Sequence, residues 1–83
     1  MRSNTPLESK VQAKIIARYE AAGYMVIKLG MTNKNGIPDL LALKEGKATF
    51  IEVKRKGCKP RPLQVYRMEE LRAHGFDCIV LDE

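Results

Sequence analysis

The segment GIPDLLALKEGKATFIEVKRK, residues 36–56, decides the fold because it holds two apolar runs separated by only three residues. Residues 39–44 and 48–54 are each apolar enough, and of the right length, to form a buried strand. The polar sequence Glu45-Gly46-Lys47 between them is typical of a tight turn. We therefore expect an antiparallel hairpin at the centre of the chain.

Three charged side chains lie within this hairpin, where a core strand usually has apolar ones. Because side chains alternate along a strand, Glu52 and Lys54 share one face of their strand with Phe50. Asp39 begins the other strand, and a tight turn brings the start of that strand near the end of its partner. The sequence therefore predicts that Asp39, Glu52 and Lys54 converge at one end of a sheet.

The rest of the chain predicts an α/β domain in the order α-β-β-β-α-β. Thr5-Pro6-Leu7-Glu8 has the form of a capping box and starts a helix that should stop at Gly23. Pro62 starts a second helix that should end at Gly75. Since this helix connects the last two strands, those strands should run parallel in a small mixed sheet flanked by helices. We expect one domain over residues 1–83, with helices at about 5–22 and 62–74 and strands at about 24–29, 39–44, 48–54 and 77–82.

The composition is that of an ordinary globular protein, with 45% hydrophobic and 30% charged residues. No apolar run approaches the roughly 18 residues of a membrane span. The polar N-terminus does not resemble a signal peptide, so we expect a cytoplasmic protein. Cys58 and Cys78 lack the spacing of a zinc site, and we expect them to be reduced thiols that pack in the fold.

The formal net charge of +5 and the pI near 9.4 favour a polyanionic partner such as nucleic acid. Several basic residues fall in one short stretch without an acid: Lys54, Arg55, Lys56, Lys59 and Arg61. This stretch is a candidate for contacts to the phosphates of a nucleic acid. A solvated loop that only keeps the protein soluble is the alternative.

Two polar residues occupy positions on the apolar faces of the predicted helices. At about 100° per residue, Glu8 lies in the same stripe as Val11 and Ile15, and Gln64 lies in the stripe of Met68. A buried carboxylate or amide needs a polar partner, so both residues are candidates for a functional site. In the alternative, Glu8 serves only the capping box and the helix dipole, and Gln64 bonds a buried backbone carbonyl.

Together these residues suggest a Mg²⁺ site next to a cation. Glu8, Asp39 and Glu52 offer the hard carboxylate oxygens that Mg²⁺ prefers. Lys54 is expected beside them and Gln64 on the opposite side. A water on Mg²⁺ can attack a phosphodiester, and a neighbouring lysine can orient that water or stabilise the developing negative charge. A salt-bridge cluster without catalysis is the alternative for the same residues.

The chain also resembles a known family. Pro38-Asp39 followed by Glu52-Val53-Lys54 matches the PD-(D/E)xK nuclease signature, and the predicted order of elements resembles the restriction-endonuclease-like core of that superfamily. More narrowly, the chain is similar over nearly all its length to a stand-alone VRR-NUC (virus-type replication-repair nuclease) domain. The similarity runs from Glu8 through Gly36-Ile37-Pro38-Asp39 and Ile51-Glu52-Val53-Lys54 to Leu63-Gln64 and Gly75.

The resemblance implies that Asp39, Glu52 and the backbone carbonyl of Val53 bind the metal. It also implies that Lys54 is the catalytic lysine and that Glu8 and Gln64 are active-site residues carried by the helices. The implied cofactor is Mg²⁺, with Mn²⁺ as a substitute, and the implied partner is DNA. Small free-standing members resemble Holliday junction resolvases, so we expect a homodimer that cuts branched DNA in a bacterial or phage-infected cell.

Other function classes stay open at this point. A nucleic-acid-binding module with this fold but no catalysis is one, and a partner protein whose basic loop contacts an acidic surface is another. Neither needs carboxylates that face a phosphate. Within the enzyme class, a less selective DNase is the alternative to a junction-cutting enzyme. Sequence-specific cutting is disfavoured because so short a chain has no obvious spare element to read base edges.

Overall fold

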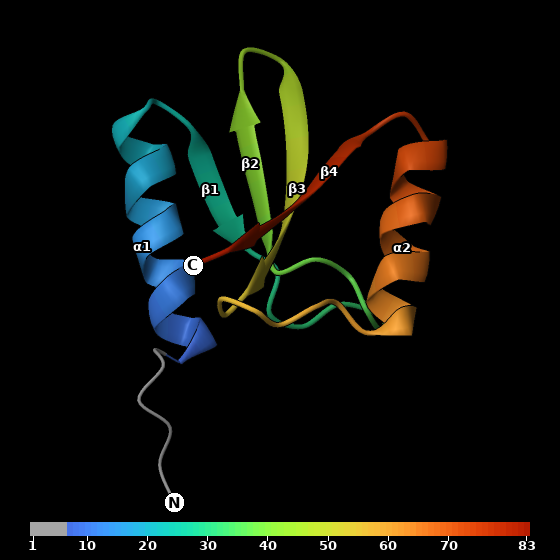
Figure 1. The fold of residues 1–83 in the computed structure, drawn as a ribbon. Helices are drawn as coiled ribbons and strands as arrows, with labels where there is room; N and C mark the ends of the chain where they lie inside the picture. The colour runs from blue at the N-terminus through green and yellow to red at the C-terminus, as the bar shows by residue number, and fades with distance from the viewer. Residues whose placement is uncertain (1–6) are drawn as a thin grey trace, which may run out of the picture.

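A computed structural model describes residues 7–83, which form two helices and four strands in the expected order. The helices are α1 (Glu8–Ala21) and α2 (Pro62–Ala73). The strands are β1 (Met25–Lys28), β2 (Leu40–Lys44), β3 (Lys47–Lys54) and β4 (Asp77–Asp82). Figure 1 shows the sheet in the middle, with α1 beside β1 and α2 on the side of β4. The predicted α/β fold is confirmed.

The helices begin and end close to their predicted positions, except at the start of α1. The predicted capping box includes Thr5 and Pro6, which lie outside the described residues. In the structure α1 begins at Glu8, with Leu7 at the N-cap position. Leu7 has no side-chain oxygen to cap the first turn, and its carbonyl accepts from the N–H groups of Lys10 and Val11.

The four strands form one mixed sheet in the spatial order β1-β2-β3-β4. β2 pairs antiparallel with β1 and β3, whereas β3 and β4 are parallel, as the α2 crossover requires. Lys44 pairs with Lys47, so the hairpin turn contains only Glu45 and Gly46. Their φ angles of 51° and 78° fit a type I′ turn, whose twist matches that of the strands. Lys47, which we placed in the turn, is the first residue of β3.

The core lies between α1 and one face of the sheet. Its buried side chains form a single cluster: Val11, Ile15, Leu40, Ala42, Ile51 and Val53. Leu40 pairs with Ile51, and strand alternation puts Val53 on the same face. Each fully buried aliphatic side chain of this kind stabilises the fold by roughly 1.5–3 kcal/mol. This packing fixes α1 against the part of β3 that leads to Glu52 and Lys54.

The opposite face of the sheet is only partly covered. α2 contacts β4, where Cys78 is buried. Met25, Ile27 and Val80 stay exposed on this face. Cys58 is exposed and only Cys78 packs in the fold, so our expectation of two packing thiols is wrong for Cys58. Neither helix within residues 7–83 has the length and apolar character needed to cross a membrane.

Candidate active site

The three charges of the hairpin meet at the end of the sheet where β3 finishes. Leu40 pairs with Ile51, which places Asp39 beside Glu52. The Oδ2 atom of Asp39 accepts a hydrogen bond from the backbone N–H of Val53 at 2.9 Å. The Nζ atom of Lys54 lies 3.5 Å from Oε2 of Glu52. The convergence predicted from the hairpin is therefore present in the structure.

Glu52 has the most unusual environment of the three. Its side chain is 1% exposed, and neither carboxylate oxygen has a hydrogen-bond partner among residues 7–83. Burial, with a smaller contribution from the charge of Asp39, raises the pKa of Glu52 to about 7, although Lys54 opposes the shift. A buried carboxylate needs a proton or a cation to offset the loss of water. The Glu52 side chain is therefore arranged like a ligand for a cation.

Asp39 is held on a loop that packs against α2. Burial raises the pKa of Asp39, and the hydrogen bond from Val53 opposes this rise. Upstream in the same loop, Gly36 has a φ of 82°, and a Cβ atom there would lie 2.8 Å from Cγ of Leu63. Only glycine allows this conformation and this close approach without strain. Gly36 therefore permits the close packing of the loop that leads to Asp39.

Arg67, which is also on α2, holds the same loop. Its Nε donates to the backbone carbonyl of Asn35 at 2.7 Å. A second guanidinium nitrogen of Arg67, Nη1, donates to Oε1 of Glu70 at 3.0 Å. Our reading of the sequence did not single out Arg67, because a contact between residues so far apart leaves no local pattern.

Lys54 lies between two carboxylates. It is 7% exposed, and its Nζ lies 3.8 Å from Oε2 of Glu8 as well as 3.5 Å from Oε2 of Glu52. Glu8 lies in the first turn of α1, on the stripe of Val11 and Ile15, and this position places its carboxylate near Lys54. The ion pairs expected for a salt-bridge cluster are thus present, but both are long contacts for charged groups.

Gln64 lies at the start of α2, and its expected place in the active site stays a prediction. Its Oε1 accepts a hydrogen bond from the backbone N–H of Arg61 at 2.8 Å, so it caps the start of α2. The alternative that we considered, a bond to a buried carbonyl, also differs from this structure, because Gln64 accepts rather than donates. A signal for the cap was available: Pro62 begins the helix, and a glutamine at the third helical position typically reaches back to the N-cap.

The arrangement suits a metal ion held by two carboxylates better than one held by three. Within the part of the chain described, no three His, Cys, Asp or Glu side chains are grouped closely enough to hold a metal. The predicted set of Glu8, Asp39 and Glu52 is therefore not assembled, since Glu8 lies beside the lysine. Mg²⁺ usually takes one or two carboxylates and keeps several waters. Asp39 and the buried oxygens of Glu52 fit this requirement.

The basic stretch forms the connection from β3 to α2. Lys56, Lys59 and Arg61 are exposed, and Arg55 is half-buried. The base of the connection is fixed to the end of the chain, because the N–H of Lys56 donates to the Glu83 carbonyl and the N–H of Glu83 donates to the Lys54 carbonyl. The stretch therefore leaves the sheet at the same end as the candidate site (Figure 1).

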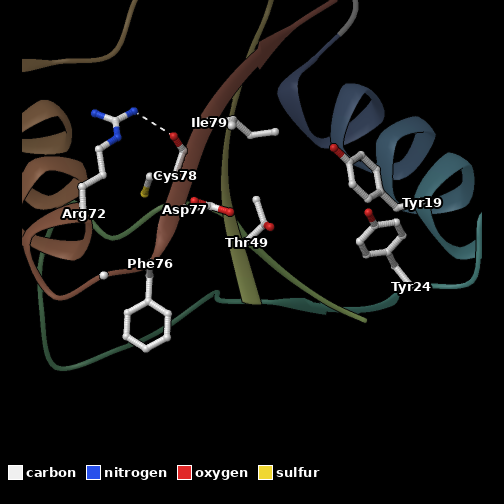
Figure 2. A pocket seen from close by; sticks show the side chains of 9 residues that line it. Tyr19, Tyr24, Thr49, Arg72, Phe76, Asp77, Cys78 and Ile79 are labelled. Atoms are coloured by element: carbon white, nitrogen blue, oxygen red, sulfur yellow. Dashed lines mark hydrogen bonds between the residues drawn. The ribbon is translucent and has the colours of Figure 1, made fainter. Parts of the chain in front are cut away.

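A separate hollow lies at the other end of the sheet. Figure 2 shows Thr49 and Asp77 in its floor, with Tyr19 and Tyr24 on one side and Arg72 donating to the Cys78 carbonyl on the other. Thr49 lies five residues before Lys54 on β3, which is about 16 Å along a strand. The hollow is therefore distinct from the cluster of Asp39, Glu52 and Lys54.

Comparison with known proteins supports a relationship over almost the whole chain. "Putative nuclease p44" of Acyrthosiphon pisum secondary endosymbiont phage 1 is 34% identical over 76 residues, which is 90% of this chain and 82% of that protein. A solved structure described as "VRR_NUC domain" has 37% sequence identity and a TM-score of 0.82, over 92% of this chain and 84% of its own. Another, "VRR_NUC domain protein", has the same fold, with a TM-score of 0.76 and 21% identity over 95% and 79% of the two chains.

No model of a known protein family matches the chain. The agreement in fold and sequence nevertheless covers 92% of this chain in one solved structure and 90% in the phage protein. The resemblance that we noted in the sequence is therefore confirmed. The chain belongs to the VRR-NUC domain family.

Proposed function

We propose that this chain is a Mg²⁺-dependent endodeoxyribonuclease of the PD-(D/E)xK type, with Mn²⁺ able to replace Mg²⁺. The likeness to VRR-NUC domains and to a phage nuclease supports a nuclease, and a nuclease of this fold implies a divalent metal. The observation that carries the proposal is the buried carboxylate of Glu52 beside Asp39 and Lys54. A binding module or a structural salt bridge has no use for a second carboxylate that repels the first.

Asp39, Glu52 and the backbone carbonyl of Val53 would hold the metal. Bound Mg²⁺ supplies Lewis-acid polarisation of the scissile phosphate and lowers the pKa of a bound water. The Val53 N–H fixes the orientation of the Asp39 carboxylate. Lys54 is restrained by Glu8 and Glu52, so its ammonium is placed to orient the attacking water or to stabilise negative charge on the phosphate.

The test is a cleavage assay on four-way, flap, duplex and single-stranded DNA, with Mg²⁺ and with EDTA. Asp39→Asn and Glu52→Gln should each abolish cutting while the proteins remain folded. Asp77→Asn is the matched control, since it removes an exposed acid at the far end of the sheet. Near-normal cutting by a pure Glu52→Gln protein would refute the metal-site assignment. Tight DNA binding without cutting by the unmodified chain would instead favour the binding module.

We further propose that the active species is a homodimer that prefers branched DNA. Two nicks in strands of like polarity need two sites related by a two-fold axis. The incompletely covered sheet face, with Met25, Ile27 and Val80 exposed, offers apolar surface that a second copy could bury. The net charge of +5 and the basic residues near the site suit recognition of a junction through its phosphates rather than its bases.

Sedimentation and mixed chains test this second proposal. A mixture of active chains with Glu52→Gln chains should yield heterodimers that nick only one strand of a four-way junction. Sedimentation as a monomer, both free and on DNA, would rule out the homodimer. Equal rates on junction and plain duplex would rule out the preference for branches and leave a less selective DNase.

A further inference from the structure

The loop between β1 and β2, residues 29–39, carries an apolar side chain in an unusual position. Its central sequence, GMTNKNG, is otherwise polar or glycine. Met31 is 97% exposed, the highest value among the exposed large apolar side chains of residues 7–83. Single exposed apolar residues are common on protein surfaces, so exposure alone does not identify a site. The position and the anchoring of the loop provide two further observations.

The loop begins beside the candidate active site. The backbone N–H of Leu29 donates to the carbonyl of Asp39 at 2.8 Å. Met31 follows two residues later, and two residues of chain span at most about 8 Å between Cα atoms. The basic connection 55–61 leaves the sheet at this same end, and Figure 1 shows both segments there. The loop that carries Met31 therefore lies at the same end of the sheet as Asp39, Glu52 and the basic connection.

The loop is also anchored along its length. The Oγ1 of Thr32 donates to the Lys34 carbonyl at 2.8 Å and accepts from the Lys34 N–H at 3.2 Å. Arg67 donates to the carbonyl of Asn35, and Gly36 packs against α2. These contacts lie after Met31, and the bond from the Leu29 N–H to the Asp39 carbonyl lies before it, so the loop is held on both sides of Met31. Folding gains almost nothing from an apolar side chain that stays in water, so the loop presents Met31 to solvent without a structural benefit.

We infer that Met31 is an apolar wedge that inserts between base pairs of the DNA substrate next to the scissile phosphate. This inference rests on the proposed nuclease function. Apolar side chains, including methionine, can enter a base step, partly unstack it and kink the duplex, which costs a few kcal/mol for each step. The cost is smallest where pairing or stacking is already broken. Met31 therefore favours substrates with interrupted stacking, such as junctions, flaps and mismatches.

Two substitutions of similar size separate the wedge from other roles. Met31→Leu keeps an apolar side chain, whereas Met31→Gln keeps the length and removes the apolar character. On junction or flap DNA we expect Met31→Gln to cut about tenfold more slowly than the unmodified chain and Met31→Leu to cut nearly normally. An abasic site at the inserted step should restore the rate of Met31→Gln, because the unstacking is then already done.

A second measurement detects the insertion of residue 31 into the DNA in a protein that cannot cut. In chains that also carry Asp39→Asn, binding to DNA with 2-aminopurine beside the scissile phosphate should raise its fluorescence when residue 31 is Met or Leu. With Met31→Gln this rise should be lost. Equal cutting and equal fluorescence for the Met31→Gln and Met31→Leu proteins would overturn the wedge. So would dissociation of a homodimer by Met31→Gln, which would place Met31 in the subunit interface.

The unmodified chain distinguishes failure of the wedge from failure of the proposed function. If it cuts DNA and Asp39→Asn does not, while Met31→Gln behaves normally, only the wedge is wrong. If it neither binds nor cuts any of the substrates, the nuclease proposal fails and the wedge fails with it.

Discussion

Replacement of Glu52 by glutamine should change how the stability of the metal-free protein depends on pH. The pKa of Glu52 is raised from 4.5 to about 7, mainly by burial. Between these two values the unfolded chain has released the proton while the folded chain still holds it. The free energy of unfolding must therefore fall as the pH rises through this window. Glutamine has no proton to lose, so the substituted protein lacks this component.

The size of the effect follows from the two pKa values. A separation from 4.5 to about 7 corresponds to about 3 kcal/mol, at about 1.4 kcal/mol for each pH unit. A domain of 83 residues has a total stability of roughly 4–12 kcal/mol. The charged form of Glu52 thus removes a large part of the stability at pH 8. The buried amide of Glu52→Gln also lowers the free energy of unfolding, but by an amount that does not depend on pH. This amount cancels when the two proteins are compared only by how their unfolding free energies change with pH.

Urea unfolding in EDTA, followed by circular dichroism from pH 4.5 to 8, measures this change. The difference in unfolding free energy between Glu52→Gln and the unmodified chain should shift by about 3 kcal/mol in favour of the variant as the pH rises. Glu69→Gln, which removes an exposed glutamate, is the matched control and should run parallel to the unmodified chain. Mg²⁺ should stabilise the unmodified chain at pH 8 and not Glu52→Gln. Parallel curves for Glu52→Gln and the unmodified chain would refute the argument.

Changes at the lysine, the basic connection and the β1–β2 loop should have separable effects. Lys54→Ala should slow cutting by roughly 10²- to 10⁴-fold with DNA affinity largely kept, and an equal loss of affinity would argue against a role in the chemical step. Neutralising the basic side chains of residues 55–61 should flatten the log–log salt dependence of binding by about 0.9 for each lost duplex phosphate contact. An unchanged salt dependence would show that they do not touch the DNA backbone. Gly36→Ala should destabilise the fold by more than ~1 kcal/mol, because φ is positive and the new Cβ would meet Leu63; an unchanged urea midpoint would contradict this.

Most of the fold was predictable because its decisive contacts are local. A turn as short as Glu45-Gly46 fixes the register of β2 against β3, and alternation then fixes which side chains share a face. The helical crossover through α2 fixes the parallel pairing of β3 and β4. The capping box predicted for α1 includes Thr5 and Pro6, which lie outside the described residues, so it stays a prediction.

In the candidate site too, the residues that local contacts bring together were the predictable ones. Asp39, Glu52 and Lys54 could be brought together from the sequence because one hairpin carries them all. Gln64 was expected opposite the lysine, although its position three residues after Arg61 and two after Pro62 already favoured a local cap. The unpaired N–H groups at the start of a helix lie only three residues away, so a local bond to Arg61 can form without any tertiary contact.

The burial of Glu52 supports the proposal that a divalent cation completes the site. Its neighbours on β3, Ile51 and Val53, belong to the buried core, and replacing a buried ion pair by apolar residues is often neutral or stabilising. For stability alone, apolar residues in place of both Glu52 and Lys54 would therefore serve at least as well as this pair. The long contact to Lys54 offsets only part of the burial penalty, since the pKa of Glu52 remains raised to about 7. A divalent cation held jointly with Asp39 would favour the charged form of both carboxylates, so metal binding and stability should be coupled most strongly above pH 7.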